Sequence, residues 1–252
     1  MGFSSFRFTR ALIALPLALA AATLAIGMPA QAQTGLGTQI AAALPDQGEI
    51  HLGLFNEGDR DGFMRLGWIK SADGVLVYDR SMMPSGEIYE AMAIALAPDM
   101  TLENVELVFH RGTARMGLDL AFANGQAAGH RTISRLESEQ VQDVEFAVPA
   151  GTLPRALAFL MPLVLPEEAG SEARFHWYGP LGNAFADITI TAHPGGMVET
   201  PAGSFDTTRY EIRGGAPDND VFVTHGENRR VVRIDVIGSE LQFLALPEPE
   251  AE

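Results

Sequence analysis

Residues 115–125 read RMGLDLAFANG, and this stretch decides the fold class. Met116, Leu118 and Leu120 alternate with smaller or polar residues, which is the two-residue period of a strand with one buried face. Asn124-Gly125 follows at once, and this dipeptide favours a hairpin because both turn residues tolerate positive φ. The stretch therefore predicts an antiparallel hairpin.

The same alternation recurs along the chain, between segments rich in turn residues. The further predicted strands are residues 49–56, 62–71, 75–82, 105–110, 187–192, 208–213, 221–224, 232–236 and 241–246. The predicted turns are residues 59–62, 72–74, 194–196, 218–220 and 226–228. This pattern indicates a mainly β protein, either a curved antiparallel sheet or a partly open β-barrel with one or two short helices.

Two segments are predicted to be helical. Residues 38–44 form a short helix that Pro45 stops. Residues 152–165 form the second, with Thr152 as the N-cap and Pro154 in the first turn. Its side chains are apolar nearly all round, which predicts burial, and Pro162 should kink or end it. Because no linker or repeat interrupts the chain, residues 33–252 are expected to form one β-rich domain.

The N-terminus has the three parts of a secretory signal peptide, predicted to span residues 1–32. Arg7 and Arg10 supply the positive charge, residues 11–27 supply the apolar run, and Ala30-Gln31-Ala32 supplies the small-residue cleavage site. Cleavage is expected at Ala32/Gln33. The mature protein is therefore expected in the periplasm.

Composition excludes several classes of protein. The chain contains no cysteine, so the exported form can carry neither a lipid anchor on cysteine nor a disulfide. Its net charge is −15, and loss of Arg7 and Arg10 takes it to −17. Such a charge opposes binding to nucleic acid or to an anionic membrane surface. The chain has few aromatic residues and ends PEPEAE, so an integral membrane protein is not expected.

No catalytic or metal-binding motif is present in the sequence. The six histidines lack the close spacing of metal ligands, and neither a G-x-S-x-G nor an S-x-x-K motif occurs. We expect no metal, no cofactor and no catalytic residue that can be named. A pair of carboxylates far apart in sequence, as glycosidases use, stays open because 32 acidic residues are available.

The run FHWYGP at residues 175–180 is the densest aromatic segment. In a strand, Phe175 and Trp177 point to one face while His176 and Tyr178 point to the other. The functional interpretation is a wall that stacks against a ligand or a partner. The alternative is ordinary packing at a strand end.

Residues 197–210, MVETPAGSFDTTRY, resemble the signature of a family of exported bacterial β-rich proteins of unknown function, with the motif T-P-a-G-x-F. The resemblance covers mainly residues 141–246. It implies a half-barrel similar in outline to the periplasmic carriers of lipoproteins, which hold acyl chains on a concave face. Phe205 and Tyr210, which lie in this stretch, join Phe175, Trp177 and Tyr178 as candidate binding residues.

Three functions follow as expectations. The first is a non-enzymatic periplasmic protein that binds an amphiphile or a hydrophobic segment on the concave face of the β half-barrel. The second is an assembly factor that binds another envelope protein through its acidic surface and residues 175–178. The third is an envelope hydrolase.

Overall fold

The computed structural model describes residues 30–136 and 138–247. The predicted fold class is confirmed: 65% of the structure is strand and 9% helix, arranged as one large, curved, unclosed antiparallel sheet with two short helices. The predicted signal peptide falls largely on residues 1–29, which lie outside the described residues.

The sheet has fifteen strands, and its order follows the chain in two runs that meet at β1. The first run is a meander of β1 (Gln47–Asn56), β2 (Asp59–Ser71), β3 (Gly74–Met83), β4 (Ile88–Leu96), β5 (Leu102–Arg111), β6 (Ala114–Ala123), β7 (Gln126–Arg135) and β8 (Ser138–Ala147). The second run is β9 (Leu153–Pro154), β10 (Glu172–Gly179), β11 (Ala184–Thr200), β12 (Gly203–Arg213), β13 (Asn219–Thr224), β14 (Val231–Val236) and β15 (Leu241–Ala245). Since β15 pairs with β1, the two runs form one continuous sheet.

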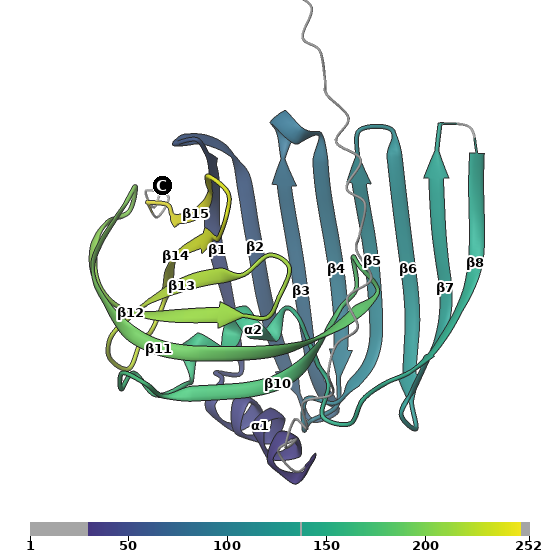
Figure 1. Cartoon of the computed structure of the whole chain (residues 1–252), viewed down its shortest axis with the longest axis horizontal. Helices are drawn as coiled ribbons and strands as arrows, with labels where there is room; N and C mark the ends of the chain where they lie inside the picture. The colour runs from purple at the N-terminus through teal and green to yellow at the C-terminus, as the bar shows by residue number, and fades with distance from the viewer. Residues whose placement is uncertain (1–29, 137, 248–252) are drawn as a thin grey trace, which may run out of the picture.

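The second run bends over one face of the first. Figure 1 shows β1–β8 as an extended sheet with β10–β13 crossing in front of it. The face of β1–β8 turned toward these strands, called the inner face, carries Val77, Ile94, Val105 and Leu120, none of which exposes any surface. The residues that alternate with these along each strand lie on the opposite side of the sheet, called the outer face, and are turned toward solvent. One hydrophobic core therefore lies between the two runs.

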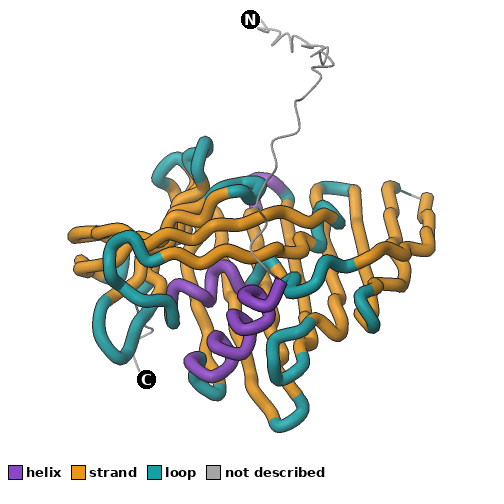
Figure 2. Tube along the Cα trace, turned by 60° about the horizontal axis from the view of Figure 1, so that its bottom comes forward, coloured by secondary structure: helices purple, strands orange, loops and turns teal. Residues whose placement is uncertain are grey.

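Two helices cover the end of the core. They are α1 (Ala30–Ala43) and α2 (Leu157–Leu160), and the 3-10 turn Met161–Leu163 follows α2. Figure 2 shows both helices against the strands on the same side of the molecule. The predicted burial of the second helix is confirmed, because Leu157, Ala158 and Leu160 are buried.

The only lysine of the chain anchors α1 to the sheet. Lys70 on β2 donates hydrogen bonds from Nζ to the carbonyl oxygens of Ala41, at 3.0 Å, and Leu44, at 2.7 Å. Trp68, two residues earlier on the same face, donates from Nε1 to the carbonyl of Pro45 at 2.9 Å. A cation at the C-terminal end of a helix satisfies free carbonyls and favours the helix dipole.

Several local predictions are confirmed. Asn124 and Gly125 form the turn between β6 and β7, both with positive φ (53° and 72°). Pro162 follows the last α-helical turn of α2, as expected. A turn at residues 72–73, just before Gly74 begins β3, and a bend at residues 226–228 also separate strands where turns were predicted.

Other local predictions are wrong. The helix expected at 152–165 is only α2, because Leu153-Pro154 instead add in parallel to β10 beside Trp177 and Tyr178. The helix expected at 38–44 is present and ends at Ala43, before Pro45, and only its start differs, since it begins at Ala30. The turn expected at 194–196 is a bulge within β11, since both sides continue to pair with β12.

One turn prediction fails for a similar reason, since residues 59–62 belong to β2, and Asp59, Arg60 and Gly62 pair with β1. The register shifts between Arg60 and Gly62, and the φ of Gly62, 141°, is one that side chains disfavour. The actual turn is Glu57-Gly58.

Replacement of Lys70 by Met should lower the free energy of unfolding by about 1–3 kcal/mol, because the carbonyls of Ala41 and Leu44 lose a charged donor. Urea denaturation followed by circular dichroism measures this change. The matched control is Arg115→Met, which removes an exposed cation from β6 and should change stability by less than about 0.5 kcal/mol. Equal effects of the two substitutions would contradict the anchoring role.

Candidate functional site

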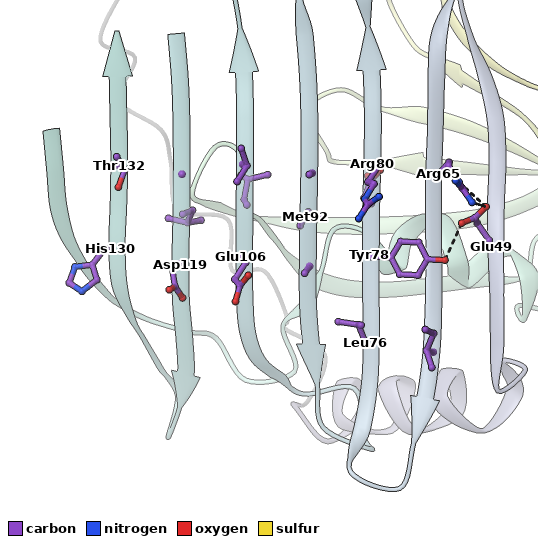
Figure 3. Close-up of a pocket in the computed structure, with 18 of the residues that line it drawn as sticks. Glu49, Arg65, Leu76, Tyr78, Arg80, Met92, Glu106, Asp119, His130 and Thr132 are labelled. Atoms are coloured by element: carbon purple, nitrogen blue, oxygen red, sulfur yellow. Dashed lines mark hydrogen bonds and ion pairs between the residues drawn. The ribbon is translucent and has the colours of Figure 1, made fainter. Parts of the chain in front are cut away.

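The outer face of β1–β8 is hollowed into a trough of about 1070 Å3, which we call the outer trough. Figure 3 shows it from the side opposite to Figure 1, with its lining residues on neighbouring strands. The cross-strand pairs Tyr78↔Ala93, Ala93↔Glu106 and Glu106↔Asp119 place these residues in one row. The site therefore depends on the register of the meander.

The floor of the outer trough is made of small residues. Ala91 and Ala93 are the outward residues at the centre of β4, and Gly117 faces outward at the same level on β6. Short side chains at these positions leave the backbone of the sheet close to the surface. Larger side chains on β3, β5 and β8 stand around them and give the trough its depth.

One wall is a hydrogen-bonded group on β1, β2 and β3. Arg65 donates from Nε and Nη2 to Oε1 of Glu49, at 3.0 and 2.9 Å, and the hydroxyl of Tyr78 donates to Oε2 at 3.0 Å (Figure 3). The bonds to Glu49 raise the pKa of Arg65, and burial, helped by the carboxylate, raises that of Tyr78. This wall keeps its charges paired.

The Tyr78 ring crosses β2 because residue 67 is glycine. A Cβ on Gly67 would lie 2.2 Å from Cζ of Tyr78. The ring therefore occupies the space of the missing side chain and reaches Glu49 on the far strand. Gly67 is thus required for the geometry of the wall.

The other charged groups of the outer trough are not neutralised in this way. Arg80 on β3 has neither an ion pair nor a hydrogen-bond partner within residues 30–136 and 138–247. Glu106 and Asp119 lie directly opposite each other on β5 and β6, where like charges repel. His130 bonds through Nδ1 to Asp143 on β8, at 2.9 Å. Among the described residues, the trough thus holds one cation, Arg80, near one wall and two carboxylates, Glu106 and Asp119, toward the other, none of them in an ion pair with a side chain of those residues.

Apolar side chains fill the spaces between these charges. Leu76 is 44% exposed, Val108 46% and Val141 62%, and all three line the trough. Exposed apolar residues grouped on one face commonly mark an interaction site. The outer trough therefore offers apolar area and charge together.

A second group of ionisable residues lies on the inner face. Burial, together with the charge of Glu90, raises the pKa of Asp79 to about 7, while a hydrogen bond from Ser81 (3.0 Å) and the Arg155 cation oppose the shift. Burial also raises the pKa of Glu90. The guanidinium of Arg155 lies over the rings of Phe159 and Trp177 at 5.8 and 5.6 Å. Among 32 acidic residues in the sequence, nothing singles out Asp79 and Glu90 as such a carboxylate pair.

The aromatic residues predicted to bind a ligand lie in a different place. Phe175, Trp177 and Tyr178 on β10 and Tyr210 on β12 are buried, and Phe205 is half-buried. The ring of Tyr178 contacts those of Phe122, Phe146 and Phe185. None of the five lines the outer trough, and their role in binding stays a prediction.

Tyr210 is held by polar contacts of its own. Its hydroxyl donates toward the carbonyl oxygens of Leu165 and Pro166, both at 3.1 Å, and accepts from Arg229. Burial raises the pKa of this phenol. These bonds hold the segment that follows α2 against β12, so Tyr210 has a structural role.

No known protein family, curated protein or solved structure matches this chain. Within the described ranges, no helix has the length and apolar character needed to cross a membrane. The same residues contain no group of three or more histidine or acidic side chains placed to hold a metal ion.

The raised pKa of Asp79 predicts a stability that depends on pH. Between the ordinary value of 3.8 and about 7, the folded protein holds a proton that the unfolded chain releases, so stability falls as pH rises through this window. At about 1.36 kcal/mol per pKa unit the loss reaches at most about 4 kcal/mol. Asp79→Asn should remove this pH dependence. The free energy of unfolding of the variant, measured relative to that of the wild type, should therefore rise between pH 5 and pH 8.

Urea denaturation of the wild type and Asp79→Asn at pH 5 and pH 8 provides the measurement. The control is Asp73→Asn, in the exposed turn between β2 and β3, which should follow the wild type at both pH values. Parallel pH profiles for wild type and Asp79→Asn would show that Asp79 is ionised normally.

Proposed function

We propose that this protein is an exported, non-enzymatic binding protein of the bacterial periplasm that holds an amphiphile in the outer trough. The observation that carries the proposal is the trough itself, with a volume of about 1070 Å3. Ligand sites commonly occupy several hundred to about a thousand Å3 and combine apolar lining with a few polar groups.

The chemistry of the lining supports an amphiphile over a wholly polar ligand. An alkyl chain lying across Ala91 and Ala93 would cover the exposed side chains of Leu76 and Val108. Each Å2 of apolar surface removed from water contributes about 25 cal/mol. Arg80, whose side chain has no ion pair or hydrogen bond with the described part of the chain, supplies a cation for an anionic headgroup. The amphiphile expected is therefore one with an acyl chain and a carboxylate or phosphate.

A second candidate, an envelope hydrolase, is supported by one observation, the raised pKa values of Asp79 and Glu90. Carboxyl groups with raised pKa values serve as general acids in many enzymes. A hydrolytic activity lost in both Asp79→Asn and Glu90→Gln would favour this candidate.

Binding can be measured with residues 33–252 and a dansyl-labelled undecanoic acid, whose fluorescence rises in an apolar site. Ala93→Phe fills the floor of the trough and should weaken binding at least about tenfold, or about 1.4 kcal/mol. Ala121→Phe is the matched control, because Ala121 faces outward on β6 but does not line the trough. Arg80→Gln should weaken binding of the acid more than that of the corresponding alcohol.

Native mass spectrometry of the protein purified from cells should also detect a bound amphiphile. Equal weakening by Ala93→Phe and Ala121→Phe would place the ligand elsewhere. Absence of both a bound amphiphile and probe binding would refute the proposed function.

Export is tested separately. In a bacterium with two membranes, the protein should be recovered by osmotic shock with Gln33 at its N-terminus, because signal peptidase cleaves after Ala32. Replacing Arg7 and Arg10 by Glu should leave the full-length precursor in the cytoplasm, whereas Arg60→Glu in β2 should not. A full-length N-terminus in the shock fluid would contradict cleavage.

A further inference from the structure

The two edges of the fifteen-stranded sheet are very different. One edge is β9, which contains only Leu153 and Pro154, and proline has no N–H to offer. The backbone N–H of the next residue, Arg155, donates to the carbonyl of Tyr178, which closes this edge further. The other edge, β8, is ten residues long and has no second strand partner in the part of the chain that the structure describes.

The backbone of β8 is regular and presents a defined set of groups. It pairs with β7 over its whole length without a register shift. The N–H of Val148 donates to Gly125 on the β7 side, so alternate, even-numbered residues direct their backbone groups toward β7. The N–H and C=O groups directed to the open side therefore belong to Glu139, Val141, Asp143, Glu145 and Ala147.

Natural proteins usually shorten, bend or cover such an edge, because it can pair with any extended chain. Strand β8 has none of the usual protective features, namely proline, a bulge or lysine. It carries acidic side chains instead. Glu139, Asp143 and Glu145 all face outward and are exposed, and the strand contains no basic residue. The backbone of this edge is thus free to pair with an added strand, and its negative charge favours a basic one.

This charge argues against a second copy of the chain as the occupant. If two β8 strands paired about a twofold axis centred on the strand, Glu139 would lie opposite Glu145 of the other copy. Like charges directly opposite each other destabilise a strand pair. A strand with lysine or arginine at the same positions would instead form favourable cross-strand pairs.

The inner side of β8 adds a second requirement. Val144 and Phe146 are half-buried, and the ring of Phe146 contacts those of Tyr178 and Phe185. An added strand would place its inward side chains next to Val144 and Phe146 at the C-terminal end of β8. Apolar side chains would lose most contact with water there. Gln140 and Gln142 at the other end favour polar neighbours.

We propose that the open edge of β8 binds an extended basic segment of another protein by adding it to the sheet as a further strand. The segment has lysine or arginine at alternate positions along the outward face. It has an apolar residue on the inward face beside Val144 and Phe146. Main-chain hydrogen bonds supply affinity and the alternate side chains supply specificity.

A peptide with the ten-residue length of β8 and alternating lysine and valine tests the proposal, using residues 33–252 as the receptor. We expect saturable binding by fluorescence polarisation, weakened by added salt because the charges are exposed. Amide hydrogen exchange should slow at Val141, Asp143 and Glu145. Two matched peptides, one with glutamate for lysine and one N-methylated at alternate backbone nitrogens, should each bind at least tenfold more weakly.

Two substitutions separate strand pairing from simple charge attraction. Glu145→Pro removes an N–H from the open edge, and Glu145→Ala removes the same charge while keeping the N–H. Proline is tolerated on the open side of an edge strand, and circular dichroism checks that the variant folds. The proline variant should bind the lysine peptide at least fivefold more weakly than the alanine variant.

Equal affinity for the N-methylated and unmodified peptides would overturn the proposal, since it would show binding by charge alone. So would a dimer of the chain that Glu145→Pro dissociates, which would identify a second copy as the occupant. If the proline variant fails to fold, the comparison of peptides still decides the result. Because Glu145 does not line the outer trough, binding of the dansyl probe tests the proposed function independently.

Discussion

The pairing of β1 with β15 is the contact on which the rest of the structure depends. It joins the strands that come first and last in chain order among the described residues, in the register Leu52↔Ala245 to Asn56↔Leu241. Since β1 is then paired on both sides, the ends of the sheet fall on β8 and β9. The second run adjoins β1 through its last strand, β15, and bends over the inner face, so the outer face of the meander stays uncovered. The outer trough and the open edge are both consequences of this pairing.

Close to this junction, two aromatic rings lie over glycines of the neighbouring strand, one on each face. Trp68 covers Gly48 on the inner face, and Tyr78 covers Gly67 on the outer face. In each case a Cβ on the glycine would fall inside the ring, so the glycine makes room for a side chain that bridges strands. The inner ring ties the end of α1 to the sheet through Pro45, whereas the outer ring builds a wall of the trough.

Local signals in the sequence predicted the elements whose structure is set locally. Asn124-Gly125 defines its hairpin because the turn needs positive φ at both residues, whatever the rest of the chain does. Predictions failed where a distant partner decides the conformation. Residues 152–154 begin like a helix, yet Leu153 and Pro154 pair with β10, and residues 194–196 look like a turn, yet β12 holds them in a strand.

The candidate site escaped the sequence analysis for a related reason. Strand β4 reads IYEAMAIAL, in which alanine alternates with apolar residues, so no polar face marks it as a strand. Those same alanines, Ala91 and Ala93, form the floor of the outer trough. Small residues become a site only when larger neighbours on β3 and β5 stand beside them, which the register decides. Aromatic residues were the visible signal, but the fold uses Phe175, Trp177 and Tyr178 in its core.

The outer trough and the open edge share one residue, and this has a thermodynamic consequence for the two proposals. Val141 lines the trough with its side chain and belongs to β8. A strand added to β8 would cover part of this exposed side chain and extend the surface beside it. An amphiphile that contacts the added strand would therefore bind more tightly when the basic segment is present. By linkage the segment would bind more tightly, by the same factor, when the amphiphile is present. If both proposals hold, occupancy of the outer trough and occupancy of the β8 edge would rise together, without any change in the fold.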